Sequence, residues 1–308
     1  MEERKFGMPS MKGMPGGFDP LTFVPPMADI SWVKRKYLDV EYGMSNAQKI
    51  DIYLPDEGDG PFPAIVHIHG GGFEIGDKRD DHMDAYLDGI RRGYVVASIE
   101  YRLSREAKFP AAVLDVREAV RFLRAHAAEY AIDPKRIGLI GGSAGSNLCA
   151  MLAMNIPNGE FMGESKEQPY LADPYVKTAV CQFGPMNFAA MEKQAKENGI
   201  SETHPDPSTM AESKYLGVNI PDADPALIAA ANPATYASEA MCPILVQHGT
   251  MDHLVPYAQG EEFVEAVAAK AGRDKVTFVP VEGADHEDKK FTTNPNMSLV
   301  WDYYQKHL

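Results

Sequence analysis

A serine flanked by glycines lies at the centre of the segment RIGLIGGSAGSNLCAMLAMN, residues 136–155. Gly141 and Gly145 stand two residues before and two residues after Ser143. Such a sequence between a strand and a helix is typical of a sharp turn that exposes the serine hydroxyl, because glycine lets chains pass without a Cβ clash. The hydroxyl would then lie at a helix N-terminus, where unpaired N–H groups favour negative charge. Ser143 is therefore predicted to be a nucleophile.

A second motif, HGGGF at residues 69–73, directly follows the apolar run AIVHIH. Consecutive glycines cost backbone entropy, so they indicate a loop whose backbone must approach something closely. Acyl transfer passes through a tetrahedral oxyanion, and each preorganised N–H donor contributes roughly 10² to 10³ in rate. We expect the amides of Gly71, Gly72 and Ala144 to form an oxyanion hole. His69 is expected to hold the glycine loop by hydrogen bonds.

The nucleophile needs a base, and the base needs a carboxylate that orients it. After a nucleophile on a turn of this kind, the acid and then the histidine follow along the chain. Asp252 lies just past the buried run ILVQHG, and His286 lies just past the run VTFVPV. Because the carboxyl ends of parallel strands share one edge of a sheet, Ser143, Asp252 and His286 are predicted to converge there.

Neighbouring residues compete for the acid and base roles. His253 adjoins Asp252 too closely in sequence to be oriented by it, and His248 lies in the end of a strand. Both histidines are interpreted as structural. Asp285 and Asp288 flank the predicted base and are alternatives for the acid, but neither follows a strand of its own. Asp252 is therefore preferred.

A metal site is the rival interpretation of His67 and His69, whose spacing places both imidazoles on one face of a strand. A metal needs three or four ligands, and no further His or Cys pair has ligand spacing. We expect no metal and no cofactor, and interpret His67 as a core residue. The cysteines stand far apart in apolar surroundings and are interpreted as reduced, buried thiols: Cys149, Cys181 and Cys242.

The elements that must position these residues follow an alternating pattern. Short apolar runs rich in Val and Ile occur at residues 64–69, 94–101, 136–142, 176–183, 244–249 and 276–281. Such runs suit strands buried on both faces of a parallel sheet. An amphipathic helix is expected over residues 111–130. Two alternating stretches at 37–43 and 49–55 predict an outer antiparallel hairpin. The fold class is therefore α/β, with a mostly parallel central sheet flanked by helices.

One hydrolase-type domain over residues 34–308 is expected, after an N-terminal arm at 1–33 that is rich in Met, Pro and Gly. About sixty residues separate the strand ending near Phe183 from the one starting near Ile244, more than a crossover helix needs. Residues 184–240 are expected to form a cap-like insertion, with helical pieces at 187–198 and 207–217. A mere surface excursion is the alternative.

The formal net charge of −14 makes nucleic acid and anionic membranes poor partners, because both bind through Lys and Arg. No apolar run has the length of a signal peptide or a membrane span, which predicts a cytoplasmic location. The expected partner is a small-molecule ester, with no nucleic acid and no membrane. A homo-oligomer is left open.

Taken jointly, six segments resemble the esterase and lipase family of α/β-hydrolases related to hormone-sensitive lipase and to bacterial feruloyl and acetyl esterases. They are HGGGF, EYRLSREAKFPAAVLDVREAVRFLR, GGSAGSN, NPATY, HGTMDHLVP and GADH. The resemblance covers about residues 34–306. It implies an α/β-hydrolase fold and esterase activity on small acyl esters, with Ser143, Asp252 and His286 as the triad. The hormone-sensitive-lipase branch usually has an acidic residue where this chain has Gly142, so the chain is more similar to the feruloyl and acetyl esterase branch.

These observations predict a serine carboxylesterase that hydrolyses small or short-acyl esters through an acyl-enzyme. An acetyl xylan or feruloyl-type esterase on plant-derived esters is an alternative, as is an amidase or peptidase with the same triad. A ligand receptor that lost the chemistry is disfavoured because His286 is present. Four residues could line an acyl pocket or belong to the core: Phe73, Phe183, Met186 and Phe188.

Overall fold

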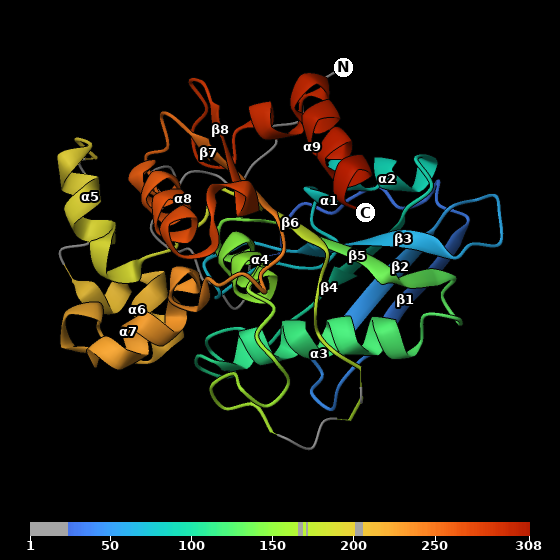
Figure 1. Ribbon diagram of the computed structural model, residues 1–308, viewed down its shortest axis with the longest axis horizontal. Helices are drawn as coiled ribbons and strands as arrows, with labels where there is room; N and C mark the ends of the chain where they lie inside the picture. Colours follow the sequence, from blue (N-terminus) through green and yellow to red (C-terminus); the bar gives the residue numbers. More distant parts are fainter. Residues whose placement is uncertain (1–23, 166–168, 171, 201–205) are drawn as a thin grey trace.

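An eight-stranded sheet runs through the computed structural model, which describes residues 24–165, 169–170, 172–200 and 206–308 (Figure 1). The strands are β1 (Arg35–Glu41), β2 (Lys49–Leu54), β3 (Phe62–Ile68), β4 (Val95–Ile99), β5 (Ile132–Gly142), β6 (Thr178–Gln182), β7 (Ile244–Gly249) and β8 (Val276–Val281). Their order is β1-β2-β4-β3-β5-β6-β7-β8. β2 pairs antiparallel with β1 and β4, and the other pairs are parallel. The predicted mostly parallel α/β sheet is confirmed.

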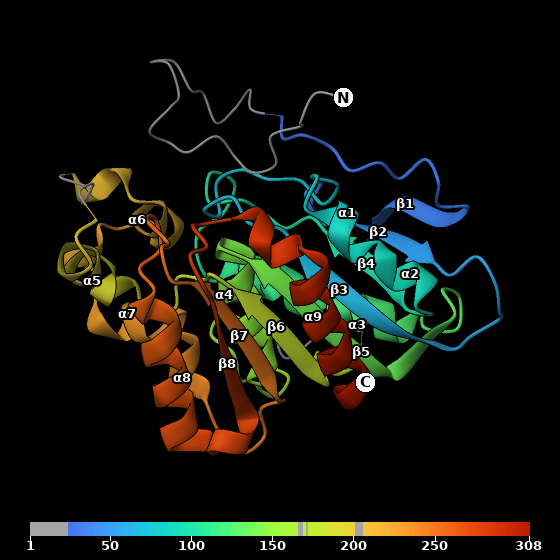
Figure 2. The same ribbon diagram turned by 90° about the horizontal axis from the view of Figure 1, so that it is seen from above.

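Helices cover both faces of this sheet (Figures 1 and 2). One layer contains α3 (Ala111–Ala125), α4 (Ala144–Ala153) and α8 (Ala258–Ala271). The other contains α1 (Met83–Tyr86), α2 (Asp88–Arg91) and α9 (Asn294–His307). Neighbouring strand residues point to opposite layers, so that Val66 of β3 packs in the first and Ile65 in the second. Because both faces of the sheet are covered, its inner strands β4, β6 and β7 are buried along their whole length.

The outer hairpin of β1 and β2 lies at the sheet edge as predicted, but β2 is more deeply buried than its alternating sequence indicated. Ile52 packs in the layer of α3, and Tyr53 packs in the layer of α1 and α9. Asp51 accepts hydrogen bonds from Arg79. Both faces of β2 are thus covered by packing residues. β2 is also an inner strand, because β1 forms the edge of the sheet.

Two element ends differ from the prediction. α3 ends at Ala125 instead of residue 130, and β5 begins at Ile132 instead of residue 136. Ile132 pairs with Phe62, and the ladder shifts register before it resumes at Ile137. Pro134 lies in that shift and has no N–H to donate to a neighbouring strand. The proline made the first part of β5 hard to recognise in the sequence.

The insertion 184–240 forms a lobe beside α8 at one end of the sheet (Figures 1 and 2). It contains η2 (Phe188–Ala190), α5 (Met191–Glu197), η3 (Pro207–Thr209), α6 (Ala211–Leu216), η4 (Ile220–Asp222), α7 (Pro225–Ala231) and η5 (Pro233–Tyr236). The two expected helical pieces correspond to η2 with α5 and to η3 with α6. α7 was not predicted, although Asp224 caps it by accepting from the amide of Ala226 and a proline opens its first turn.

Most of the predicted N-terminal arm, residues 1–23, lies outside the described residues, as do residues 201–205 between the two predicted helical pieces of the insertion. Within residues 24–33, Met27 bridges to Asp80, and the amide of Ala28 donates to the carbonyl oxygen of Arg79 at 2.8 Å. Val33 packs in the layer of α1 and α9. None of the helices in the described residues is long and apolar enough to cross a membrane.

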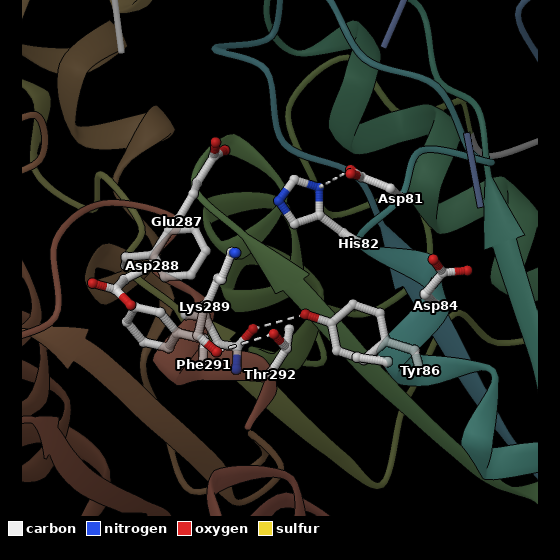
Figure 3. A pocket seen from close by; sticks show the side chains of 12 residues that line it. Asp81, His82, Asp84, Tyr86, Glu287, Asp288, Lys289, Phe291 and Thr292 are labelled. Carbon is white, nitrogen blue, oxygen red and sulfur yellow. Dashed lines mark hydrogen bonds and ion pairs between the residues drawn. The ribbon is translucent and has the colours of Figure 1, made fainter. Parts of the chain in front are cut away.

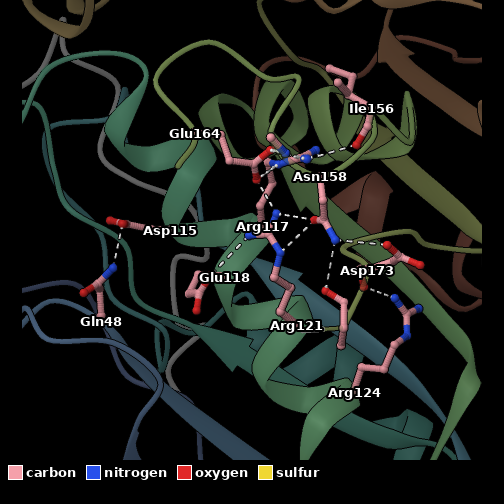
Figure 4. Close-up of polar contacts among 12 residues, drawn as sticks. Gln48, Asp115, Arg117, Glu118, Arg121, Arg124, Ile156, Asn158, Glu164 and Asp173 are labelled. Atoms are coloured by element: carbon pink, nitrogen blue, oxygen red, sulfur yellow. Dashed lines mark hydrogen bonds and ion pairs between the residues drawn. The ribbon is translucent and has the colours of Figure 1, made fainter. Parts of the chain in front are cut away.

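Two buried arginines of α3 hold the loop that follows α4 (Figure 4). Arg117 donates to both carboxylate oxygens of Glu164, at 2.8 and 2.9 Å, and to the carbonyl oxygen of Ile156 at 2.9 Å. Arg121 contacts the same carboxylate and donates to Oδ1 of Asn158 at 2.7 Å. Arg121 also forms a 3.1 Å ion pair with Glu118, so two carboxylates balance the two guanidinium groups inside the protein.

Candidate active site

Ser143 occupies a sharp turn between β5 and α4, as the glycine pattern predicted. Its backbone has φ 53° and ψ −124°, a region that non-glycine residues rarely adopt. A methyl group on Gly145 would lie 2.0 Å from the carbonyl oxygen of Ile68, and one on Gly141 would lie 2.6 Å from the carbonyl oxygen of Gly145. Both glycines are therefore required by the close approach of β3, β5 and α4 around the serine.

The three side chains predicted to form the triad lie in one hydrogen-bonded chain. Nε2 of His286 is 3.1 Å from Oγ of Ser143, and Nδ1 of His286 is 2.8 Å from Oδ2 of Asp252. The three residues follow β5, β7 and β8, at the carboxyl edge of the sheet. A neutral imidazole with its proton on Nδ1 can donate to the carboxylate and accept from the hydroxyl, which is the arrangement that nucleophilic catalysis by serine needs.

The Asp252 carboxylate is buried and fully engaged. Oδ1 accepts from the amides of Leu254 and Val255 at 2.9 and 2.8 Å, and Oδ2 also lies 3.3 Å from Nε2 of His248. Burial raises the pKa of Asp252, but the charges and hydrogen bonds of His286 and His248 outweigh burial and hold this pKa well below its usual range. The carboxylate is therefore ionised whenever the site works near neutral pH.

The pKa of His286 is shifted in the opposite direction to that of Asp252. Burial lowers the pKa of His286, but the adjacent Asp252 carboxylate outweighs burial and raises that pKa above the ordinary 6.5. A raised pKa makes the imidazole a stronger base for the proton of Ser143.

The glycine loop lies directly against the serine. A methyl group on Gly70 would lie 3.3 Å from Cβ of Ser143. Gly71 and Gly72 have φ values of 95° and 60°, which favour glycine. Within the described residues neither of their amides donates a hydrogen bond, and Ala144 is the first residue of α4. A glycine loop beside the serine and a helix that begins directly after it are features that an oxyanion hole of backbone donors needs.

His69 anchors the glycine loop to neighbouring residues. Its Nδ1 lies 2.9 Å from the carbonyl oxygen of Gly70, its ring stacks on Tyr101 at 4.4 Å, and its Nε2 lies 3.4 Å from a carboxylate oxygen of Glu100. His67 instead contacts Oγ of Ser98 at 2.9 Å in the core, where burial lowers its pKa to about 3. The described residues contain no group of three His, Cys, Asp or Glu side chains arranged for a metal.

The residues that were alternatives for the acid and base roles, in the loops after β7 and β8, have other partners. Oδ1 of Asp285 accepts from the amides of His253 and His286 at 3.0 and 2.7 Å and also contacts the imidazole of His253. Asp288 accepts from the amide of Lys290 at 2.9 Å. These carboxylates join and cap loops and do not contact the ring of His286. His248, interpreted as merely structural, supports Asp252 directly, which its place at the end of β7 did not reveal.

The insertion reaches the site through aromatic contacts. Phe73, at the end of the glycine loop, stacks on Tyr215 of α6 at 3.9 Å and meets the edge of Phe188 at 6.2 Å. Lys214 forms a 3.0 Å ion pair with Glu74 of the same loop. Phe73, Met186 and Phe188 are buried in the main core, whereas the ring of Phe183 lies 5.0 Å from that of His286. Of the four predicted acyl-pocket residues, Phe183 alone lines a pocket described below.

A pocket opens next to the triad, between α1 and the loop after β8 (Figure 3). Phe183 and Phe291 form its apolar wall, and Tyr86 lies at its base, donating to Oε1 of Gln182 at 2.8 Å. Charged side chains surround the opening: Asp81, His82, Asp84, Glu287, Asp288 and Lys289. None of these six was singled out from the sequence as part of a pocket, because α1 and the loop after β8 meet only in the folded protein.

The sequence of this chain matches a model of a known protein family. The model of the BD-FAE family matches residues 50–267, well over half of the chain. The chain belongs to the BD-FAE family. The match includes the glycine loop, the serine turn and Asp252, whereas His286 lies beyond its end.

Named relatives of this BD-FAE member are esterases. Esterase LipQ of Mycobacterium tuberculosis is 28% identical over 251 residues, covering 80% of this chain and 56% of LipQ. The probable carboxylic ester hydrolase LipM of the same organism is 29% identical over 255 residues, covering 80% of this chain and 55% of LipM. The chain therefore spans little more than half the length of these curated relatives.

A truncated carbohydrate esterase from gut microbiota has a similar solved structure. Its TM-score is 0.78 at 25% sequence identity, and the alignment covers 91% of this chain and 99% of that one. The BD-FAE chain thus has the α/β-hydrolase fold that its motifs implied.

Proposed function

We propose that this protein is a serine carboxylesterase that hydrolyses small or short-acyl esters. One observation carries the proposal: Ser143, His286 and Asp252 form a continuous hydrogen-bonded chain beside a glycine loop with unengaged amides. The names of the relatives LipQ and LipM, both ester hydrolases, support the same reaction.

In the proposed reaction, His286 takes the proton of Ser143 as Oγ attacks the ester carbonyl carbon. The negative oxygen is held by the amides of Gly71, Gly72 and Ala144. The bond to the alcohol oxygen breaks, and His286 gives the proton to the leaving alcohol. Water then attacks the acyl-enzyme by the same route and releases the acid.

Replacement of the nucleophile tests this proposal. Ser143→Ala is expected to abolish hydrolysis of p-nitrophenyl acetate and covalent labelling by a fluorophosphonate, because no other described residue of the site offers an activated hydroxyl. The control is Ser165→Ala, a serine outside the site. Near-normal turnover by Ser143→Ala would overturn the proposal.

Esters of plant polysaccharides are the second candidate substrate. The similar carbohydrate esterase from gut microbiota favours this class. A hydrolysis profile over acetyl, butyryl, octanoyl and feruloyl esters, with aminoacyl amides in parallel, separates this candidate from a general short-acyl esterase and from an amidase. The cytoplasmic location stays a prediction.

A further inference from the structure

Glu287 directly follows His286 and has a left-handed backbone, with φ 55°. A methyl group on Gly70 would lie 3.3 Å from Cβ of Ser143 and 3.6 Å from Oε1 of Glu287. The carboxylate and the nucleophile thus adjoin the same small space above the glycine loop. The residue is half-buried, so solvent does not fully screen its charge.

Among the described residues, no Lys, Arg or His forms an ion pair with the carboxylate of Glu287. His82 faces it across the pocket (Figure 3), but Nδ1 of His82 lies 3.4 Å from Asp80 and 4.0 Å from Asp81. Two carboxylates therefore already balance the charge of His82.

The charge of Glu287 contributes to the raised pKa values of two nearby histidines. Burial lowers the pKa of His82, but Asp80, with smaller contributions from Glu287 and Asp81, raises that pKa to about 9. Glu287 also adds to the raised pKa of His286, after the larger effects of burial and Asp252. A substrate charge in the same space would experience the same negative field.

In the proposed reaction the leaving alcohol receives its proton from Nε2 of His286, so the alcohol must lie on the histidine side of Ser143. Glu287 directly follows His286 in the same loop. Glu287 also lines the pocket beside this loop together with Phe183, whose ring lies 5.0 Å from that of His286.

We infer that Glu287 is a specificity-determining residue: its carboxylate selects esters of cationic or neutral alcohols against esters of anionic alcohols. This inference rests on the proposed esterase function. An anionic alcohol must bring its charge close to a carboxylate that has no ion-pair partner among the described residues. The repulsion weakens substrate binding and raises the activation barrier. A cationic alcohol gains the corresponding attraction.

The test uses three acetate esters of nearly equal shape: acetylcholine, 3,3-dimethylbutyl acetate and 2-acetoxyethanesulfonate. Release of acetic acid is followed by pH-stat, and kcat/KM is determined for the wild type and for Glu287→Gln. The ratio of kcat/KM for the cationic ester to that for the anionic ester is expected to fall about tenfold in the variant. The control is Glu262→Gln, which removes an equal charge from an exposed position of α8 and is expected to leave the ratio unchanged.

A second measurement needs no variant. In the wild type the same ratio is expected to shrink as salt rises from roughly 10 mM to 1 M, because the Debye length falls from about 30 to 3 Å. A ratio that is equal in the wild type and Glu287→Gln, or insensitive to salt, overturns the inference. A wild type that neither hydrolyses any of the esters nor is labelled by a fluorophosphonate overturns the proposed function instead. A wild type that is labelled but does not hydrolyse the cationic ester overturns only the charge preference.

Discussion

At the scale of single residues, the backbone of Ser143 is strained, and such conformations cost on the order of 1–3 kcal/mol. Pairing of β5 and packing of α4 on either side offset that cost, so the hydroxyl is held in place before substrate arrives. The same preorganisation applies to Asp252, whose Oδ1 is fixed by two backbone amides. The Ser143 hydroxyl and the Asp252 carboxylate are thus both positioned by the surrounding backbone.

Asp252→Asn is expected to lower kcat by about 10⁴, because an amide cannot hold the Nδ1–H tautomer of His286. Steady-state kinetics on p-nitrophenyl acetate measure the loss. Asp285→Asn is the matched comparison, since Asp285 contacts the amide of His286 and not its ring. We expect Asp285→Asn to lose less than about tenfold. The reverse order of the two effects would make Asp285 the acid.

The pH dependence follows from the raised pKa of His286. The imidazole must be neutral to accept the serine proton, so kcat/KM is expected to fall as the pH drops through this pKa, with a midpoint above 6.5. Asp252 raises the pKa, while burial lowers it. Asp252→Asn should therefore shift the acid limb of the remaining activity to lower pH. A limb that stays in place would show that another group titrates.

At the scale of elements, the loop between α4 and β6 depends on the carboxylate of Glu164. Glu164→Ala leaves Arg117 and Arg121 buried without their shared partner, and breaking such a pair costs about 3–5 kcal/mol. Urea unfolding followed by circular dichroism measures the change. Glu160→Ala, an exposed carboxylate on the same loop, is expected to change the free energy of unfolding by less than about 0.5 kcal/mol. Similar values for the two variants would contradict the buried network.

At the scale of the whole molecule, the cysteines report opening of the core. All of them are free and buried, and burial raises the pKa of each thiol, that of Cys242 to about 12. The folded protein is expected to react with Ellman's reagent only as fast as it unfolds, whereas denatured protein exposes three thiols at once. A thiol that reacts in the folded state at the rate of free cysteine would contradict this burial.

The sequence alone determined the mostly parallel sheet and singled out the three residues of the proposed triad. The apolar run 244–249 coincides with β7, because a strand that is buried on both faces consists mostly of apolar residues. The glycines around Ser143 were readable because only glycine fits where backbones approach so closely. Strand ends could be assigned to one edge because parallel strands share a direction.

Only the tertiary structure decided which side chains of distant loops meet. The contact of His248 with Asp252, the stacking of Tyr215 on the glycine loop and the place of Glu287 beside Ser143 depend on side-chain direction and loop path. These have no period or spacing in the sequence, since a loop conformation results from packing against elements far away in the chain. The turn that holds Ser143 could therefore be predicted from the local sequence pattern, whereas the side chains that surround Ser143 could not.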